Sequence, residues 1–455
     1  MITRDFIKDV LTLDVQDFSY LYTPRNLQIT LSGAPDSRKR GLCNRIAIFF
    51  WHTAQSILAL RNYRPFSPNR ILFVSTTTNQ RRAMASIVNQ MAGACRVNIL
   101  HTKPINLPLL FAYLLALPFF PLVAFKFLRA RGDKRTAFYH VFDRYWCAYG
   151  YYLMVRLLLR RTTPKAVVVA NDHVFWFRAF VKAAQDENIP TIYLQHASVT
   201  KRFPPLSFDY ALLEGIDTLN KYVSCGSSQT EVFLVGMPKF DAFAYSLNDN
   251  DRVHSIGICT NPLDSFQEVK TLCACLKESF PDMNFFLRPH PGDKRYRNWE
   301  ELAYTYSWQF SNGKEEGVFQ FLHHVDAIIA GDSSIHLEAA LLNVFPIYYV
   351  FGRQKKDSYG FQQNGLVEFF ETPEAVQTKI SELREYIPPV RSRSRLYNAT
   401  VSTKYDGRST KLTCVLIDQI ARGLTPDLTG WELIAAVKEL RAYQPDKVSN
   451  IFLFS

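Results

Sequence analysis

Two apolar segments in the second half of the sequence each end in a short polar motif, and this feature most constrains the fold. Phe285–Leu287 leads directly into Arg288–Pro291, and Ala327–Ala330 leads into Gly331–Ser334. A buried strand that ends in polar residues and is followed by a helix is typical of the binding edge of an open α/β sheet. We therefore expect the polar ends of these two strands to meet at one edge of a sheet.

The residue types in these motifs indicate a phosphate site. Ser333 and Ser334 can cap a helix that begins near Ile335, and free N–H groups and the positive dipole end of such a helix attract phosphate. Arg288 and His290 would add charge and hydrogen-bond donors from the adjacent loop. The motifs together predict a cradle for a phosphorylated ligand such as a nucleotide. Taken singly, each also fits a plain cap or an ordinary turn.

The same pattern of strand and helix recurs along the chain. A chain of 455 residues is too long for one ordinary core. We expect an α/β protein with two Rossmann-like, doubly wound domains and a cleft between their sheet edges. The first domain is expected at 1–248 and the second at 249–424, joined by a polar linker near 246–252. The remainder, 425–455, is expected to hold a helix at 431–441, because Thr429 and Glu432 resemble a capping box. We expect this helix to cross back to the first domain.

The expected strands are short apolar runs bounded by turn residues. They are 70–76, 97–100, 166–170, 191–194, 210–213 and 232–235 in the first domain, and 255–259, 284–287, 308–310, 327–330 and 346–350 in the second. Helices are expected at 45–60, 79–91, 145–161 and 177–185, besides the helix that follows Ser334.

An uncharged segment interrupts the first domain between Pro104 and Phe125, and extra N-terminal helices are expected there. The segment from His101 to Lys165 holds 11 Lys/Arg and 2 Asp/Glu, which gives +9 of the net charge of +12. An apolar, aromatic stretch with a basic flank fits a monotopic membrane anchor over 104–135. The alternative is a pair of buried helices that pack on the first sheet. The flanking cations are Lys126, Arg129, Arg131, Lys134 and Arg135.

His196 is the first candidate for chemistry, because it directly follows the expected strand 191–194 at the edge that faces the cleft. Its near-neutral pKa suits a general base that deprotonates an acceptor hydroxyl. Asp172 ends the preceding strand and would either orient His196 or act as the base itself. Lys201 and Arg202 follow and would bind an anionic acceptor. A structural histidine and solvated loop charges are the alternatives.

Two further residues complete the predicted donor site. Gly236 follows a strand and permits close approach to a ligand, although a plain turn explains it equally. Glu338 lies one helical turn beyond Ser334 and would reach ribose hydroxyls. The donor site is thus expected to comprise Arg288, His290, Pro291, Asp332, Ser333, Ser334, Glu338 and Gly236.

Metal, disulfide and export signals are weak in this sequence. The eight cysteines include no Cys-x-x-Cys pair, which favours reduced cytoplasmic thiols over a disulfide framework or a zinc site. Asp249 and Asp251 have a spacing known from metal sites, but no strand precedes them. No metal or cofactor is therefore expected. Residues 1–17 have no apolar signal core, so secretion is not expected.

The order of the motifs resembles that of GT-B glycosyltransferases. The motifs are Gln195–Ser198, Gly236–Asp241, Arg288–Pro291, Asp332–Ser334 and Glu338 with the alanine after it. The sequence looks closest to CDP-glycerol glycerophosphotransferase-like and capsule-polysaccharide transferases. Its His-Pro and Ser-Ser pair is also similar to that of bacterial sialyltransferases and Kdo transferases. The resemblance spans about 166–365.

The resemblance implies specific roles. His196 matches the catalytic histidine, which usually precedes a glycine, whereas Ala197 follows here. His290, Ser333 and Ser334 match donor-phosphate contacts, and such enzymes are often metal-independent. The implied activity moves a glycosyl or polyol-phosphate group from a CMP- or CDP-activated donor to a glycan or lipid-linked acceptor. It would serve bacterial capsule, lipopolysaccharide or teichoic-acid-like polymers.

Location and rival functions follow from the same features. We expect a cytoplasmic protein, peripheral on the inner face of the cell membrane, with an anionic membrane surface and no nucleic acid as partner. One rival is a sugar-nucleotide epimerase or hydrolase on the same fold. The other is a non-enzymatic membrane or nucleic-acid binding module, which would leave the polar strand ends unexplained.

Overall fold

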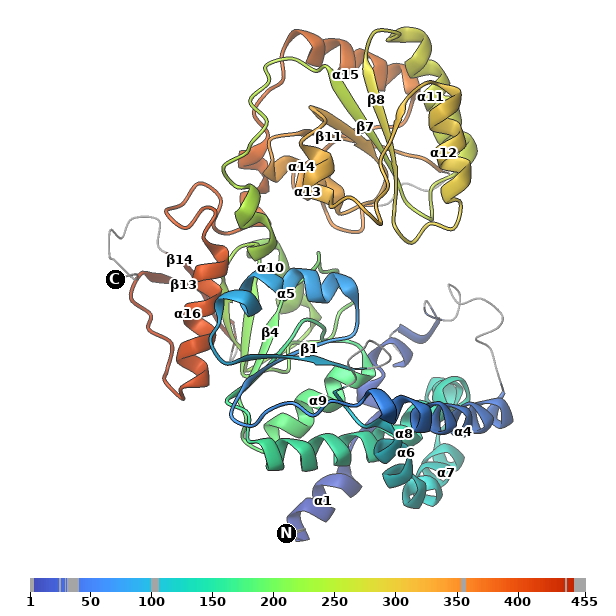
Figure 1. The fold of residues 1–455 in the computed structure, drawn as a ribbon, viewed down its shortest axis with the longest axis vertical. Coiled ribbons are helices and arrows are strands. Elements are labelled where there is room, and N and C mark those ends of the chain that lie inside the picture. Colours follow the sequence, from blue (N-terminus) through green and yellow to red (C-terminus); the bar gives the residue numbers. More distant parts are fainter. Residues whose placement is uncertain are drawn as a thin grey trace.

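Short runs of β-branched and aromatic residues form two separate sheets, each flanked by helices (Figure 1). The structure is a computed structural model that describes residues 4–23, 26–28, 30, 41–99, 106–352, 357–437 and 440–445. One domain lies above the other in Figure 1, and the chain passes between them after residue 243 and again near residue 400.

The N-terminal sheet has 8 strands within the described residues, in the order β13-β14-β6-β5-β4-β3-β1-β2. All neighbours pair in parallel except the β13–β14 hairpin. The strands are β1 (Ile71–Ser75), β2 (Ala94–Asn98), β3 (Ala166–Val169), β4 (Thr191–Leu194), β5 (Tyr210–Leu213), β6 (Glu231–Leu234), β13 (Trp431–Val437) and β14 (Leu440–Pro445).

Helices cover both faces of this sheet. One face packs against α5 (Thr78–Gln90) and α16 (Ser409–Ala421), and the other packs against α8 (Gly132–Thr162) and α9 (Phe175–Gln185). The helix α5 begins at a capping box between Thr77 and Gln80. The remaining N-terminal elements are α1 (Arg4–Thr12), α2 (Val15–Phe18), η1 (Tyr20–Tyr22), α4 (Leu42–Ala59), η3 (Leu60–Asn62), α10 (Ile216–Cys225) and η5 (Pro238–Phe243), where η denotes a 3₁₀ helix.

The C-terminal sheet has 6 strands within the described residues, all parallel, in the order β12-β11-β10-β7-β8-β9. The strands are β7 (Ser255–Thr260), β8 (Asn284–Pro289), β9 (Gln309–Phe310), β10 (Ala327–Ala330), β11 (Phe345–Tyr349) and β12 (Glu368–Phe370). Its helical elements are α11 (Phe266–Ser279), α12 (Tyr296–Thr305), α13 (Val318–Leu322), α14 (Ile335–Leu341), α15 (Pro373–Glu385) and η6 (Arg391–Leu396). The strands β8 and β10 are each neighbours of β7, so their ends share one edge of the sheet.

The predicted fold class of two Rossmann-like α/β domains with extra N-terminal helices is confirmed. Strands 191–194, 210–213 and 327–330 have the predicted bounds. The predicted helix at 431–441 is wrong, because β13 and β14 form an antiparallel hairpin there. The hairpin extends the sheet, with Tyr443 stacked on Phe233 at 5.2 Å. Residues 100, 104–105 and 446–455 of the predicted segments lie outside the described residues.

The apolar segment forms a bent helical run on the outside of α8. It comprises α6 (Leu109–Ala116), η4 (Leu117–Phe119) and α7 (Phe120–Arg129). Among the described residues, Leu109–Arg129 is the one helical run long and apolar enough to cross a membrane, judged by length and composition alone. Only 28% of its most apolar window is buried within the protein. The alternative of a pair of buried helices therefore holds only for the side of this run that packs on α8, and not for its outer side.

The C-terminal helix returns to the first domain through specific contacts. Asp241 of η5 accepts hydrogen bonds from the backbone N–H groups of Ser409 (3.0 Å) and Thr410 (2.5 Å) at the start of α16. Gly236 adopts a φ of +76°, and a Cβ there would lie 2.4 Å from Oγ1 of Thr400. Only glycine permits this close crossing of the two connections between the domains.

Candidate active site

A cleft of about 1060 Å³ separates the two domains, and residues of both form its walls. The N-terminal wall comes from α5, the ends of β4 and β5, η5 and the start of α16. The C-terminal wall comes from the ends of β7, β8 and β10 together with α13 and α14. The cleft therefore lies at the carboxyl edges of the strands, where open α/β sheets bind ligands.

His290 lies in the C-terminal wall with its tautomer set by the loop around it. Its Nδ1 accepts a hydrogen bond from the backbone N–H of Gly292 at 3.0 Å. Burial lowers the pKa of His290 and Asp293 acts in the opposite direction. A neutral imidazole with Nδ1 as acceptor carries its proton on Nε2, so His290 can offer that N–H to an anionic oxygen.

Arg288 lines the cleft but is already held by its own domain. Its guanidinium donates to Oγ of Ser311 (2.5 Å) and to the Glu316 carboxylate (3.2 Å) and carbonyl (2.9 Å). It also lies over the ring of Phe321, 4.8 Å from the centroid. These contacts place Arg288 as a support for the wall, with part of its charge neutralised.

The second motif is divided between the cleft and the loop behind it. Ser333 and Ser334 line the cleft, as does Pro291 of the first motif. The helix α14 begins at Ile335 as predicted, but Ser334 makes no capping hydrogen bond, and Ile335 N–H reaches Oγ of Ser333 only at 3.5 Å. Asp332 is not in the lining, because its carboxylate accepts from the N–H and hydroxyl of Ser358 at 3.1 and 2.5 Å.

On the opposite wall, His196 stands at the end of β4. Its buried Nδ1 has no hydrogen-bond partner in the described part of the chain. Burial and the nearby charge of Lys239 lower the pKa of His196 to about 4, so the imidazole is neutral at pH 7. The preceding Gln195 is fixed by hydrogen bonds to Glu214 and to Oγ1 of Thr218. The imidazole therefore lines the cleft on a rigid base and keeps a buried nitrogen without a hydrogen-bond partner among the described residues.

Glu214, at the end of β5, is a titratable group that sequence reasoning missed. Its side chain lines the cleft, and its Oε2 accepts from Nε2 of Gln195 at 3.1 Å. Burial raises its pKa to about 7, Lys239 opposes the rise and Glu338 adds to it. An acid directly after the apolar run 210–213 was the available signal, equivalent to the one that identified His196. A carboxyl with a pKa near 7 is matched to proton transfer at neutral pH.

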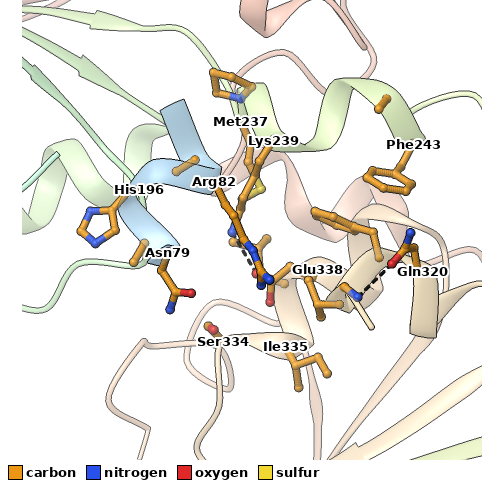
Figure 2. A pocket seen from close by; sticks show the side chains of 18 of the residues that line it. Asn79, Arg82, His196, Met237, Lys239, Phe243, Gln320, Ser334, Ile335 and Glu338 are labelled. Atoms are coloured by element: carbon orange, nitrogen blue, oxygen red, sulfur yellow. Dashed lines mark hydrogen bonds and ion pairs between the residues drawn. The ribbon is translucent and has the colours of Figure 1, made fainter. Parts of the chain in front are cut away.

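Lys239 and Glu338 form an ion pair of 2.9 Å across the cleft, from η5 to α14 (Figure 2). Burial opposes the charge on Lys239, but the carboxylates of Glu338 and Glu214 outweigh it and hold the pKa of Lys239 above its usual value. Glu338 is thus in the cleft as predicted, and its carboxylate bridges the domains in this structure.

Unpaired cations face the cleft from the N-terminal domain. Arg82 of α5 points into the space between the walls in Figure 2. Arg408, just before α16, also lines the cleft. Neither side chain makes an ion pair within the described residues. The sequence did not identify them, because they lie on a helix and a returning loop and not at a strand end.

Besides Asp332, four predicted residues lie outside the cleft lining. Asp172 is 2% exposed and is engaged by the Tyr222 hydroxyl (2.6 Å) and His173 Nδ1 (2.9 Å). Gly236 serves the crossing of the two connections. The predicted acceptor residues Lys201 and Arg202 are exposed on the loop after β4.

Among the described residues, no group of three or more His, Cys, Asp or Glu side chains is arranged to hold a metal ion. The groups that face the cleft are cations, hydroxyls, imidazoles and carboxylates. They can bind an anionic ligand and move a proton.

Comparisons with known proteins show the fold. No protein-family model matches the chain, and no curated protein matches its sequence. Among solved structures, Staphylococcus aureus MnaA with UDP is similar at a TM-score of 0.50 and 14% identity, over 79% of this chain and 98% of that one. The Neisseria meningitidis UDP-GlcNAc 2-epimerase bound to UDP-GlcNAc has a TM-score of 0.50 and 14% identity, over 76% and 98%. At such identities the likeness establishes the two-domain GT-B fold and nothing finer.

Proposed function

We propose that this protein is a transferase that moves a glycosyl or polyol-phosphate group from a nucleotide-activated donor to an acceptor hydroxyl. The observation that carries the proposal is the interdomain cleft, in which hydrogen-bond donors able to contact a phosphate line one wall and an imidazole and a carboxyl line the other. His290 and Ser334 stand on one wall, and His196 and Glu214 stand on the other. Binding and chemistry then belong to different domains.

The donor is proposed to lie with its phosphate on the C-terminal wall. His290 Nε2–H and the Ser334 hydroxyl would contact the phosphate oxygens. Arg82 would contact them from the N-terminal wall and add a positive charge. The two similar structures named above contain UDP and UDP-GlcNAc, which supports a nucleotide-activated substrate. The resemblance of the His-Pro and Ser-Ser motifs makes CMP or CDP our choice of nucleotide.

In the proposed reaction the acceptor oxygen attacks the transferred group, and the bond from that group to the nucleotide phosphate breaks. The acceptor proton passes to the protein, and the donors on the C-terminal wall stabilise the charge that the leaving phosphate gains. Two groups can take the proton. His196 is neutral at pH 7 and has an unsatisfied nitrogen, whereas Glu214 has a pKa closer to the working pH.

The pH dependence of kcat/KM separates these two bases, since a base must be deprotonated to act. If Glu214 is the base, kcat/KM rises with pH through about 7, and Glu214→Gln abolishes that rise. If His196 is the base, kcat/KM rises with pH through about 4 and does not change with pH around neutrality. Glu338 and Lys239 flank Glu214, so Glu338→Gln is the control that tests whether a neighbouring charge moves the profile.

The donor is tested by thermal unfolding with CMP, CDP, UDP and GDP. A nucleotide at 100 times its Kd stabilises the folded state by about 2.7 kcal/mol, which is readily measured. We expect cytidine nucleotides to raise Tm. A shift with UDP and none with CMP or CDP would replace the proposed nucleotide, and no shift with any nucleotide would overturn the nucleotide-dependent function.

The rival activities are epimerisation and hydrolysis of the sugar nucleotide. The fold does not distinguish these activities from group transfer, because one of the two similar structures, which contain UDP and UDP-GlcNAc, is named as an epimerase. Incubating the donor without acceptor and analysing the products distinguishes the three. Release of free sugar indicates a hydrolase, an isomeric sugar nucleotide indicates an epimerase, and a requirement for acceptor indicates the transferase.

A further inference from the structure

The helix α4 has its polarity reversed relative to an ordinary surface helix. Its one Lys, Arg, Asp or Glu is Arg45, which is buried beside Asp143 at 3.6 Å. Its solvent side carries large apolar side chains, and none of its exposed residues is charged. These side chains are Phe50, Trp51, Ile57 and Leu58, of which Trp51 is 62% exposed. A helix on a water-facing surface normally shows the opposite pattern.

The neighbouring run α6–α7 shows the same reversal. Up to Arg129, the exposed large side chains of this run are all apolar: Phe111, Leu114, Leu117, Phe120, Phe125 and Leu128. The helix α4 packs on both α6 and α8. Phe50 and Phe120 both contact Trp146, with ring centroids at 5.9 and 4.9 Å. The exposed residues of α4 and of α6–α7 therefore form one continuous surface, which we call the apolar helix face.

Exposed cations border this face at the junction of α7 and α8. The guanidinium of Arg129 lies 4.5 Å from the ring centroid of Phe125, and that of Arg135 lies 5.5 Å from the Phe127 centroid. The two guanidinium groups thus lie over aromatic rings at the border of the face. The cationic rim is Arg129, Arg131, Lys134 and Arg135. Lys126 is not part of it, because its ammonium donates to the Leu13 carbonyl (3.1 Å) and the Tyr149 hydroxyl (2.8 Å).

We propose that the apolar helix face and its cationic rim dock the protein reversibly on an anionic lipid bilayer. The rim meets anionic headgroups, and the aromatic and aliphatic side chains enter the boundary between headgroups and acyl chains. Exposed aromatic side chains are suited to that depth. The proposal does not depend on the nucleotide cleft, so either idea can fail alone.

The packing of α6 favours lying on the bilayer over crossing it. A Cβ at Gly150 of α8 would lie 1.9 Å from the Ala112 carbonyl, so α6 and α8 touch backbone to backbone. The indole N–H of Trp146 also donates to the Ala116 carbonyl at 2.8 Å. Pro118 and Pro121 interrupt the run between its two helices. One side of the run is thus committed to the protein, and only the other side is available to lipid.

Charge complementarity selects lipid over a second copy of the chain. A second copy docked on the same face would bring an identical cationic rim to the interface, whereas anionic headgroups neutralise it. The membrane prediction therefore includes a dependence on lipid charge and on salt. Self-association through the face would not depend on the charge of added lipid.

The first test is cosedimentation with vesicles of phosphatidylcholine alone and with added phosphatidylglycerol, at low and high salt. We expect binding to the anionic vesicles, weakened by salt. Arg129→Gln, Arg131→Gln, Lys134→Gln and Arg135→Gln together should weaken binding by about fivefold per removed charge. Leu128→Glu should also weaken it. Leu263→Glu on the C-terminal domain is the matched control, because that leucine is 82% exposed and lies away from the face.

The second test uses fluorescence and does not depend on a disruptive substitution. Vesicles with brominated acyl chains should quench part of the tryptophan emission, and the conservative Trp51→Phe should remove that part. Wild-type protein that stays in the supernatant with anionic vesicles at low salt would overturn the proposal. So would unchanged binding in the rim variant, or a dimer in solution that Leu128→Glu converts to a monomer without any effect on vesicles.

Discussion

The two walls of the cleft differ in how far their polar groups are already satisfied. On the C-terminal wall, Arg288 is held by Ser311 and Glu316, and His290 is held by the backbone of Gly292. On the N-terminal wall, His196 keeps a buried nitrogen without a partner in the described residues, and Arg82 makes no ion pair among them. A pre-arranged wall is suited to binding at little reorganisation cost, whereas the titratable groups of the other wall are suited to proton transfer.

The largest expected effect separates chemistry from binding. Replacing the general base should lower kcat by about 10² to 10⁴ while nucleotide affinity stays within a few-fold. His196→Ala and Glu214→Gln are compared by kcat and by nucleotide titration, with Asp172→Asn as the buried control. If Asp172→Asn alone is inactive, proton transfer does not occur on the N-terminal cleft wall and the comparison of the walls fails.

Breaking the ion pair across the cleft should have the next largest effect. Lys239→Met leaves Glu338 without its cation and should lower the free energy of unfolding by about 2 kcal/mol. That is less than the 3–5 kcal/mol for a fully buried pair, because the Lys239 side chain is 26% exposed. The double variant with Glu338→Gln should recover part of the loss. If Lys239→Met and the double variant unfold at the same temperature, the Lys239–Glu338 pair does not couple the two walls.

On the C-terminal wall, His290→Ala should weaken nucleotide binding by about 10- to 100-fold, the range for one hydrogen bond to a charged group. Folding should be unaffected, since the imidazole is at the edge of the wall. The nucleotide-induced rise in Tm is the measurement. If the variant keeps full nucleotide affinity but has no turnover, His290 acts in the reaction and not in nucleotide binding.

The smallest effect is expected at the exposed cation of α5. Arg82→Gln should weaken nucleotide affinity several-fold at low salt and hardly at all at high salt, since an exposed charge is screened. Arg81→Gln is the matched control on the same helix, because Arg81 is absent from the cleft lining. Equal effects of both substitutions would mean that α5 acts through its general field and not through a contact.

Much of the fold was predictable because its strands are short, apolar and clearly bounded. The runs before His196 and Gly331 are buried on both sides, the run before Arg288 is buried except for the half-buried Phe286, and their sequences show no helical period. The hairpin near the C-terminus was mispredicted because Trp431–Val437 contains Glu, Leu and Ala, which favour helix. The open edge of β6 offered a ladder of hydrogen bonds that outweighed this preference.

The candidate site was predictable mainly where a functional residue stands within a few positions of a strand end. His196, His290 and Ser334 satisfy that rule and line the cleft, and Glu338 was reached from the same motif, one helical turn beyond Ser334. Glu214 satisfies it as well and was overlooked. Arg82 does not satisfy it, because its position depends on how α5 faces the other domain. Gly236 lies outside the cleft lining, and a glycine needed for packing against Thr400 looks the same in sequence as one that approaches a ligand.

The return of the chain to its first domain has a consequence for folding during synthesis. The strand β14 pairs with β6, although the whole C-terminal domain lies between them in the sequence. During synthesis on the ribosome, the edge of β6 that pairs with β14 therefore stays unpaired until α16 and the hairpin have emerged. A nascent chain stalled in between would present that edge to other chains, and β-strand pairing between molecules is the expected form of misassembly.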